Sequence, residues 1–216
     1  MVSLPQEFFI FVSQVRPEAY LTYKHTKTFT SRFAGLLATD EGRRQLDAGQ
    51  ADPMPFIPND NMYPDLSPFS VSAMNLYRVE WDAELGRRAH NQMAPSRMSA
   101  IFAFADSATC ELVASRHNWP LDMVRRFRLA YGVPHRTARV NMEIISLLRA
   151  VYPLAMWGPE QLNAFWHHYW TGQGNLDLET PELHNGQNWR QWSSGETWEW
   201  LIEGQLVSDD DSPVFA

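Results

Sequence analysis

The chain has 216 residues, of which 44% are hydrophobic and 20% charged, as in an ordinary globular protein with one sizeable core. Its formal net charge of −7 argues against a surface that binds nucleic acid by neutralising phosphates in general. No segment approaches the ~20 apolar residues of a membrane span. The single cysteine, Cys110, rules out an intramolecular disulfide and a cysteine-based zinc site, and it favours a reducing, intracellular setting.

The first fifty residues are predicted to be largely helical. Pro17 suits the first turn of a helix, and an apolar stripe at helical spacing follows at residues 33–37. Five prolines then fall between residues 49 and 68, a density through which no helix can run, so a loop or an extended arm is predicted there. We expect residues 1–68 to form an N-terminal helical segment and arm that packs on a main domain of residues 69–216.

Two strands are predicted in the middle of the chain. In residues 73–81, Leu, Arg and Glu alternate with Tyr, Val and Trp, which is typical of a strand. Residues 98–105 are small and nearly all apolar, as expected of a strand that is buried on both faces. Asp106 then suits the N-cap of a helix that runs to about Ser115.

The remaining elements carry both helical and extended signals. Residues 121–131 are predicted to be helical, whereas residues 137–148 mix β-branched and helix-favouring side chains and fit either a strand or a helix. A further helix is expected from Gly158 to about Trp170. After a polar, Gly/Asn-rich stretch, residues 195–204 are typical of a short buried strand, so the order of elements indicates an α+β fold.

Three charged residues stand beside apolar sequence. Arg78 lies within a predicted strand, where its planar fork suits a phosphate, a carboxylate or an internal salt bridge to Glu80. Glu196 and Glu199 flank the start of the last strand, where a carboxylate is costly unless it is paired or used. By themselves, these two glutamates fit a solvated edge strand better than a catalytic site.

Three segments, taken in chain order, resemble motifs of the ADP-ribosyltransferase superfamily in its Arg–Ser–Glu type. Tyr77-Arg78 is similar to the arginine-bearing first core strand, Ser99-Ala100-Ile101-Phe102 to the serine-led strand, and Glu199-Trp200-Leu201-Ile202 to the catalytic glutamate before an apolar strand. The resemblance covers residues 70 to 208 in pieces. It implies a split β-sheet core with an N-terminal helical region and inserted helices.

The chain departs from the family pattern at two motifs. Either Ser96 or Ser99 can be the counterpart of the family's serine. Thr197 stands where a second acid or a glutamine is common, and Glu196, one residue earlier, is therefore a secondary candidate.

The resemblance implies an enzyme that cleaves the nicotinamide–ribose bond of NAD and transfers ADP-ribose to a protein or a nucleic acid, or hydrolyses NAD. Such cleavage passes through an oxocarbenium-like state, which a fixed carboxylate stabilises. By resemblance, Glu199 would stabilise this cation, Arg78 would hold the dinucleotide and Ser99 would orient Glu199. The residues implied in NAD contacts are Tyr77, Arg78, Ser96, Phe102 and Trp198. NAD would be a consumed substrate, since no dinucleotide-binding glycine motif is present, and no metal is expected.

Two other functions stay open. Seven tryptophans from Trp157 onward could present a C-terminal face to a protein partner, and Glu196 with Glu199 could form the carboxylate pair of a glycosidase. The acidic net charge favours a protein acceptor over bulk nucleic acid, although the arginines between residues 125 and 139 could form a local basic patch. Members of the family are often toxins, phage effectors or defence factors. The expected setting is the cytoplasm, of the producing cell or of a target cell, with no membrane partner.

Overall fold

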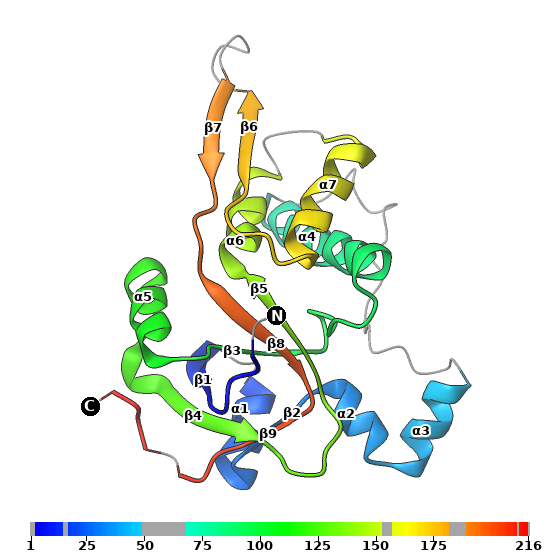
Figure 1. The fold of residues 1–216 in the computed structure, drawn as a ribbon, viewed down its shortest axis with the longest axis vertical. Coiled ribbons are helices and arrows are strands. Elements are labelled where there is room, and N and C mark those ends of the chain that lie inside the picture. The colour runs from blue at the N-terminus through cyan, green and yellow to red at the C-terminus, as the bar shows by residue number, and fades with distance from the viewer. Residues whose placement is uncertain are drawn as a thin grey trace. The chain divides into compact units, whose positions relative to one another are not determined.

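The computed structural model describes residues 3–14, 17–48, 68–152, 157–181, 189–210 and 212–215 (Figure 1). The chain divides into two compact units, each built from separate stretches. The first unit comprises residues 1–53, 99–139 and 198–216, and the second comprises residues 54–98 and 140–197. Helices and antiparallel sheets both contribute, so the predicted α+β class is confirmed, while an ADP-ribosyltransferase-like core stays a prediction.

The proline-rich arm predicted at residues 49–68 lies outside the described residues, except for Pro68, which begins a helix. The division of the chain at residue 68 therefore stays a prediction.

Four strands form one sheet of the first unit, in the order β1-β4-β9-β2. Their bounds are β1 Phe8–Phe11, β2 Thr28–Thr30, β4 Val124–Leu129 and β9 Gln205–Val207. β1 pairs with β4 from Phe11 opposite Val124 to Phe8 opposite Phe127, whereas β9 pairs with the far end of β4 at Arg128 and Leu129.

A three-stranded sheet in the order β3-β8-β5 follows. Its strands are β3 Ile101–Ala103, β5 Arg136–Asn141 and β8 Trp198–Glu203, and the last residues of β5 already belong to the second unit. The helices of the first unit are α1 Pro17–Thr26, α2 Arg32–Leu37, α3 Asp40–Asp47 and α5 Ser107–His117, with short 3-10 helices at Val12–Gln14 and Leu121–Met123.

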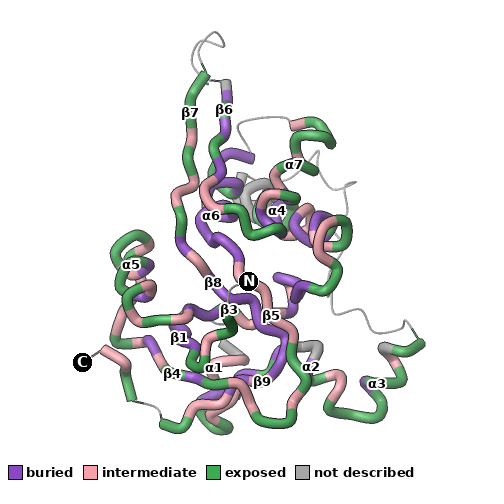
Figure 2. Tube along the Cα trace, viewed as in Figure 1, coloured by how far each residue is buried: buried purple, intermediate pink, exposed green. Residues whose placement is uncertain are grey.

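The core of the first unit lies between its strands and α1, where the tube in Figure 2 is buried. It consists of Phe8, Ile10, Val12, Tyr23, Phe29, Ala103, Phe127, Trp200, Ile202 and Leu206. Because successive side chains of a strand point to opposite faces, the core positions of Trp200 and Ile202 direct Glu199, Leu201 and Glu203 to the other face of β8. Both carboxylates of β8 therefore share one face.

Three helices and a hairpin form the described part of the second unit: α4 Pro68–His90, α6 Met142–Val151, α7 Pro159–Trp170, β6 Asp177–Pro181 and β7 Trp189–Ser193. α4 packs against α6 and α7. At Gly86 of α4, an added Cβ would lie 2.4 Å from the Cβ of Trp166, so glycine permits this close approach of α7. The indole of Trp170 donates to the carbonyl oxygen of Ala83 at 2.7 Å and ties the two helices together.

The strand predicted at residues 73–81 is wrong, because this stretch is helical within α4. Val79 and Ala83 are fully buried four residues apart, and Gly86 follows three residues later. This is the spacing of one helix face. The alternation of side chains over these few residues also fits a strand. The packing of α6 and α7 against α4 favours the helix.

The helix predicted at residues 121–131 is also wrong, because a 3-10 turn at Leu121–Met123 leads into β4. Val124 and Phe127 are buried three residues apart, which imitates helical spacing. Pairing with β1 and β9 makes the stretch a strand. The hairpin of β6 and β7 falls in the polar stretch 171–197, whose composition does not predict strands.

Other predictions are confirmed. Asp106 caps α5 by accepting from the backbone N of Thr109 at 2.6 Å, α7 begins at Pro159, and β8 is the predicted buried closing strand. The ambiguous stretch 137–148 divides: β5 ends at Asn141, and α6 begins at the next residue. No helix among the described residues is both long and apolar enough to cross a membrane.

Candidate functional site

β3 and β8 are far apart in sequence and lie side by side in the first unit. They pair antiparallel, with Ile101 opposite Ile202 and Ala103 opposite Trp200. Ser99 stands two residues before β3, so it lies near the end of β8. The serine-led segment and the glutamate-bearing segment singled out in the sequence are therefore neighbours in one sheet.

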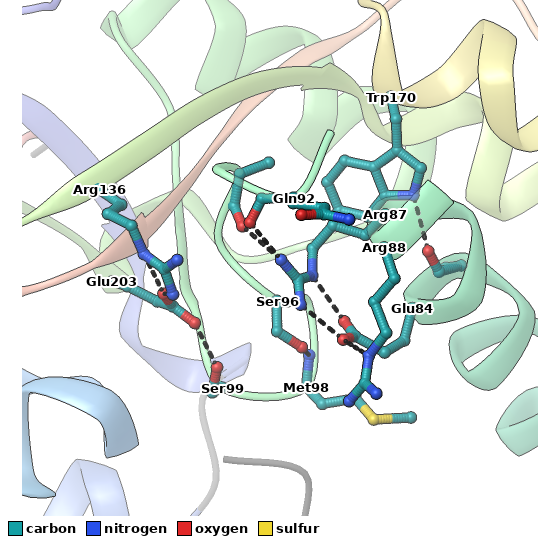
Figure 3. A network of polar contacts seen from close by, with 12 residues as sticks. Glu84, Arg87, Arg88, Gln92, Ser96, Met98, Ser99, Arg136, Trp170 and Glu203 are labelled. Atoms are coloured by element: carbon teal, nitrogen blue, oxygen red, sulfur yellow. Dashed lines mark hydrogen bonds and ion pairs between the residues drawn. The ribbon is translucent and has the colours of Figure 1, made fainter. Parts of the chain in front are cut away.

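A buried carboxylate, that of Glu203, marks the end of β8 (Figure 3). The hydroxyl of Ser99 donates to Glu203 Oε1 at 2.6 Å, and Arg136 donates to Oε2 from Nε at 2.9 Å and also from Nη2. The Glu203 side chain is 1% exposed and that of Arg136 is 32% exposed. A charge so deeply buried requires such a partner, because its desolvation is otherwise uncompensated.

The turn after Glu203 is fixed by α2. Ser31, the N-cap of α2, donates its backbone N–H to the carbonyl oxygen of Gly204 at 3.0 Å and accepts the Gly204 N–H on its Oγ at 3.0 Å. A Cβ at Gly204 would lie 2.8 Å from the Cβ of His135. A side chain at position 204 would therefore crowd His135, and Ser31 satisfies both backbone groups of Gly204.

Glu199 lies at the opposite end of the same face of β8. It is four residues before Glu203, roughly 13 Å along the strand at 3.3 Å per residue. The residue is 5% exposed. Ser99 thus contacts the far carboxylate of β8, Glu203, and its predicted role of orienting Glu199 stays a prediction.

Aromatic side chains adjoin both strands. The guanidinium carbon of Arg139, on β5, lies 4.0 Å from the ring centroid of Trp198, which is a close cation–π contact. Trp198 is half-buried at the start of β8, and Phe102 of β3 is 38% exposed. Two of the side chains predicted to contact NAD, Trp198 and Phe102, therefore belong to the same sheet as Glu199.

Arg78 and Tyr77 belong to the second unit, on α4. Arg78 Nε lies 3.8 Å from Asp82 Oδ2, and its guanidinium lies 5.8 Å from the ring centroid of Tyr152. Burial raises the pKa of Asp82, although a hydrogen bond from Tyr152 and the charge of Arg78 oppose the shift. The acid expected beside Arg78 is thus Asp82, one helical turn away.

Ser96 also belongs to the second unit, in a network around Glu84 (Figure 3). Ser96 is buried, and its hydroxyl accepts from the backbone N of Met98 at 3.3 Å. Glu84 accepts from Arg87 at 2.7 and 2.8 Å and from Arg88 at 3.0 Å. Burial by itself would raise the pKa of Glu84, but the hydrogen bonds outweigh it and hold the pKa below 4.5. The network stabilises the end of α4.

Glu80 forms the second charged centre of α4. It accepts from Arg97 Nε at 2.9 Å and from Arg149 Nη2 at 2.7 Å, and Arg97 also donates to the hydroxyl of Tyr169 at 2.6 Å. Burial would raise the pKa of Glu80, but the two arginines hold it below its usual value. These contacts join α4 to α6 and α7, which is a structural role.

Glu196, the secondary candidate, lies in a polar network that precedes β8 in the second unit. Its Oε1 accepts from the backbone N of Asn175 at 3.2 Å. Beside it, the fully buried Asn141 accepts from the backbone N of Glu143 and of Thr197. Its amide donates to the carbonyl oxygens of Gly174 and Gly195 at 3.0 and 2.8 Å. This network fixes the backbone that leads into Trp198 and Glu199.

Outside β8, the chain's single cysteine and the histidines of α4 and α7 are also placed by the structure. Cys110 is fully buried, and desolvation, with the charges of Asp106 and Glu111, raises its pKa to about 12. Within the described ranges, no three His, Cys, Asp or Glu side chains gather in a way that could hold a metal ion. His167 lies against His90, with ring centroids 5.0 Å apart, in keeping with a packing role.

The sequence does not predict the ion pair of Arg136 with Glu203. Arg136 belongs to the group of arginines between residues 125 and 139 that could form a basic patch. An ion pair between two strands depends on sheet order, which spacing along the chain does not reveal.

Comparison of the sequence with models of known protein families and with curated proteins finds no match.

Proposed function

We propose that the protein is an NAD-consuming ADP-ribosyltransferase whose catalytic carboxylate lies on β8. The observation that carries the proposal is the pairing of β3 with β8, which joins the serine-led and glutamate-bearing segments of the resemblance in one sheet. The hydrogen bond from Ser99 to Glu203 joins the two segments at the end of β8 that is remote from Glu199. The proposal uses the first unit alone and gives no role to Tyr77, Arg78 or Ser96.

The chemistry assigns the main role to Glu199. As the bond between the ribose C1′ and the nicotinamide nitrogen breaks, nicotinamide leaves with the electron pair and the ribose gains positive charge. A carboxylate fixed on a rigid strand stabilises that charge as it develops. A nucleophilic atom of the acceptor then forms the new bond to C1′. Phe102 lies opposite Leu201, on the same face of the sheet as Glu199, and offers aromatic surface against the nicotinamide ring. Trp198 has the parity of Trp200 on β8 and therefore points to the other face.

Glu203 suits a supporting role better than the catalytic one. Its charge is already compensated by Arg136, and its side chain is almost inaccessible. A carboxylate in this state stabilises a developing cation weakly, because its own field is largely neutralised. In the proposal, Glu203 holds β8 in register beside β3 and β5.

The test follows nicotinamide release from labelled NAD, with the protein alone and with added cell lysate. We expect release by the wild type and a loss of about 100-fold or more in Glu199→Gln. Glu179→Gln is the matched control, since Glu179 is an exposed strand glutamate on β6 and its removal should leave release unchanged. Circular dichroism establishes that each variant is folded. If the wild type releases no nicotinamide with any acceptor and shows no thermal shift with NAD, the proposal fails.

The acceptor class is proposed to be protein, on the basis of the net charge of −7. Label transferred from NAD to lysate components should be removed by protease and resist nuclease. The opposite pattern would identify a nucleic-acid acceptor.

The second candidate function is a non-catalytic interaction module. The observation in its favour is Trp189 of β7, which is 63% exposed and lies opposite Pro181 in the hairpin. An exposed indole is a common anchor in protein interfaces. Trp189→Ala should leave nicotinamide release intact if the first proposal holds, whereas an interaction module would show no release in the wild type.

A further inference from the structure

A cavity of about 450 Å³ lies beside β4 in the first unit. Its walls include two arginines, Arg126 and Arg128, and three acids, Glu7, Asp209 and Asp210. The volume falls within the range of small-ligand sites. Neither Glu199 nor Glu203 lines the cavity, so ligand binding there does not depend on the proposed reaction.

The two arginines share the outer face of the sheet. They are two residues apart on β4, and Phe127 between them points into the core, so both guanidinium groups lie on the opposite side. Their side chains are 58% and 52% exposed. Arg126 Nη1 lies 3.6 Å from Glu7 Oε1, a distance of weak ion pairing. Two guanidinium forks are thus accessible from one cavity.

The carboxylate of Asp209, close to the C-terminus, is already bound to one of the two guanidinium groups, that of Arg128. Arg128 donates to Asp209 from Nε at 3.1 and 3.2 Å and from Nη2 at 2.8 Å, and Asp209 is 74% exposed. The chain beyond β9 is held along β4 by hydrogen bonds from Ser208 Oγ to the Arg126 carbonyl oxygen at 2.9 Å and from the Val214 N–H to the Val124 carbonyl oxygen at 3.1 Å. An exposed ion pair of this kind contributes little to stability, so displacing Asp209 costs little.

We propose that this cavity binds a small phosphate-bearing anion, whose oxygens replace the Asp209 carboxylate on Arg128 and also reach Arg126. A guanidinium fork binds phosphate in two-pronged fashion, and a phosphate group brings more charge and more acceptor oxygens than a carboxylate. Three acids, Glu7, Asp209 and Asp210, line the cavity beside the two arginines. Asp209 is bound to Arg128 and therefore competes with the anion, which binds as the Asp209 carboxylate moves away.

The experiment titrates the full-length protein with inorganic pyrophosphate by calorimetry at constant ionic strength. We expect measurable binding, about fivefold tighter in Asp209→Asn and about tenfold weaker in Arg128→Gln. Asp40→Asn is the matched control, because Asp40 is also an exposed acid bound to an arginine, Arg43, and its removal should leave the affinity at the wild-type value. Circular dichroism and thermal melts establish that all variants are folded.

Three results would overturn the proposal: no binding to either the wild type or Asp209→Asn, equal affinity of these two proteins, or wild-type affinity in Arg128→Gln. Pyrophosphate binding and nicotinamide release are measured separately, so failure of either leaves the other to be judged on its own result.

Discussion

Arg136 and Glu203 form an ion pair that crosses from β5 to β8, with Arg136 Nε 2.9 Å from Glu203 Oε2. The second oxygen of the same carboxylate accepts from Ser99, on the chain that leads into β3. One buried charge therefore ties together all three strands of the sheet β3-β8-β5. The proposed catalytic strand is held at one end by this contact and by the turn at Gly204.

Arg136→Gln is expected to destabilise the protein strongly. It leaves the 1%-exposed carboxylate of Glu203 without its cation, and breaking one side of a buried pair typically costs about 3–5 kcal/mol. The free energy of unfolding from urea titration gives the measurement. Arg44→Gln, which removes an exposed pair with Glu41, should change it by less than about 1 kcal/mol. Equal effects of the two variants would show that the Arg136 pair does not stabilise the sheet.

Gly86→Ala should destabilise the second unit by about 1–3 kcal/mol, because the new Cβ would lie 2.4 Å from the Cβ of Trp166 and force α4 and α7 apart. Gly35 of α2 is the matched helical control, since nothing lies within 4 Å of a Cβ added there. Gly35→Ala should be neutral or stabilising by up to about 1 kcal/mol, through helix propensity. Thermal and chemical denaturation measure both, and a neutral Gly86→Ala would contradict the close crossing.

Lowering the pH should reduce the free energy of unfolding of the second unit, because Glu84 becomes protonated. Its pKa is below 4.5 in the folded protein, so its stabilising contribution is complete above the unfolded value of about 4.5 and is lost as the pH falls through the folded value. The difference in unfolding free energy between the wild type and Glu84→Gln should therefore be largest near pH 7 and shrink below about pH 4.5. A difference that stays constant down to pH 3 or so would contradict this account.

Asp82 is a control for Glu84, because its pKa is shifted in the opposite direction. Burial raises its pKa above 3.8, so ionising it in the folded protein carries a cost that appears as the pH rises through the folded value. Asp82→Asn should remove this cost, so the loss of stability between about pH 3.8 and the folded pKa of Asp82 should become smaller. The same urea titrations measure it, and a steeper dependence would be the wrong sign.

Cys110 should be unreactive in the folded protein. The thiol is fully buried and its pKa is raised to about 12, so almost no thiolate exists at neutral pH. A chromogenic disulfide reagent should modify it only as fast as the protein unfolds, with the rate rising in urea. Rapid modification of the native protein would show that the first unit opens locally around α5.

Much of the local structure could be predicted where the sequence carries its own signal. Asp106 caps α5, Pro159 opens α7, and β8 follows from the apolar run before Gly204. The predictions that are wrong concern stretches whose secondary structure is determined by tertiary packing. Residues 73–81 and 121–131 each satisfy both helical and extended spacing over a few positions, and their neighbours in space select the outcome.

The candidate site was predictable only in part. The pairing of the serine-led and glutamate-bearing segments agrees with the expectation that both belong to one core. The contact of Ser99 with Glu203 depends on strand register, and the strand order brings Arg136 to the same carboxylate. Register and strand order arise from long-range pairing, which no spacing along a single chain encodes.

The most direct test of the central claim is the rate of nicotinamide release from NAD by the wild type and by Glu199→Gln, with both proteins folded as judged by circular dichroism. We expect release by the wild type and a rate lower by about 100-fold or more in the variant. Equal rates, or no release from the wild type with any acceptor, would contradict it.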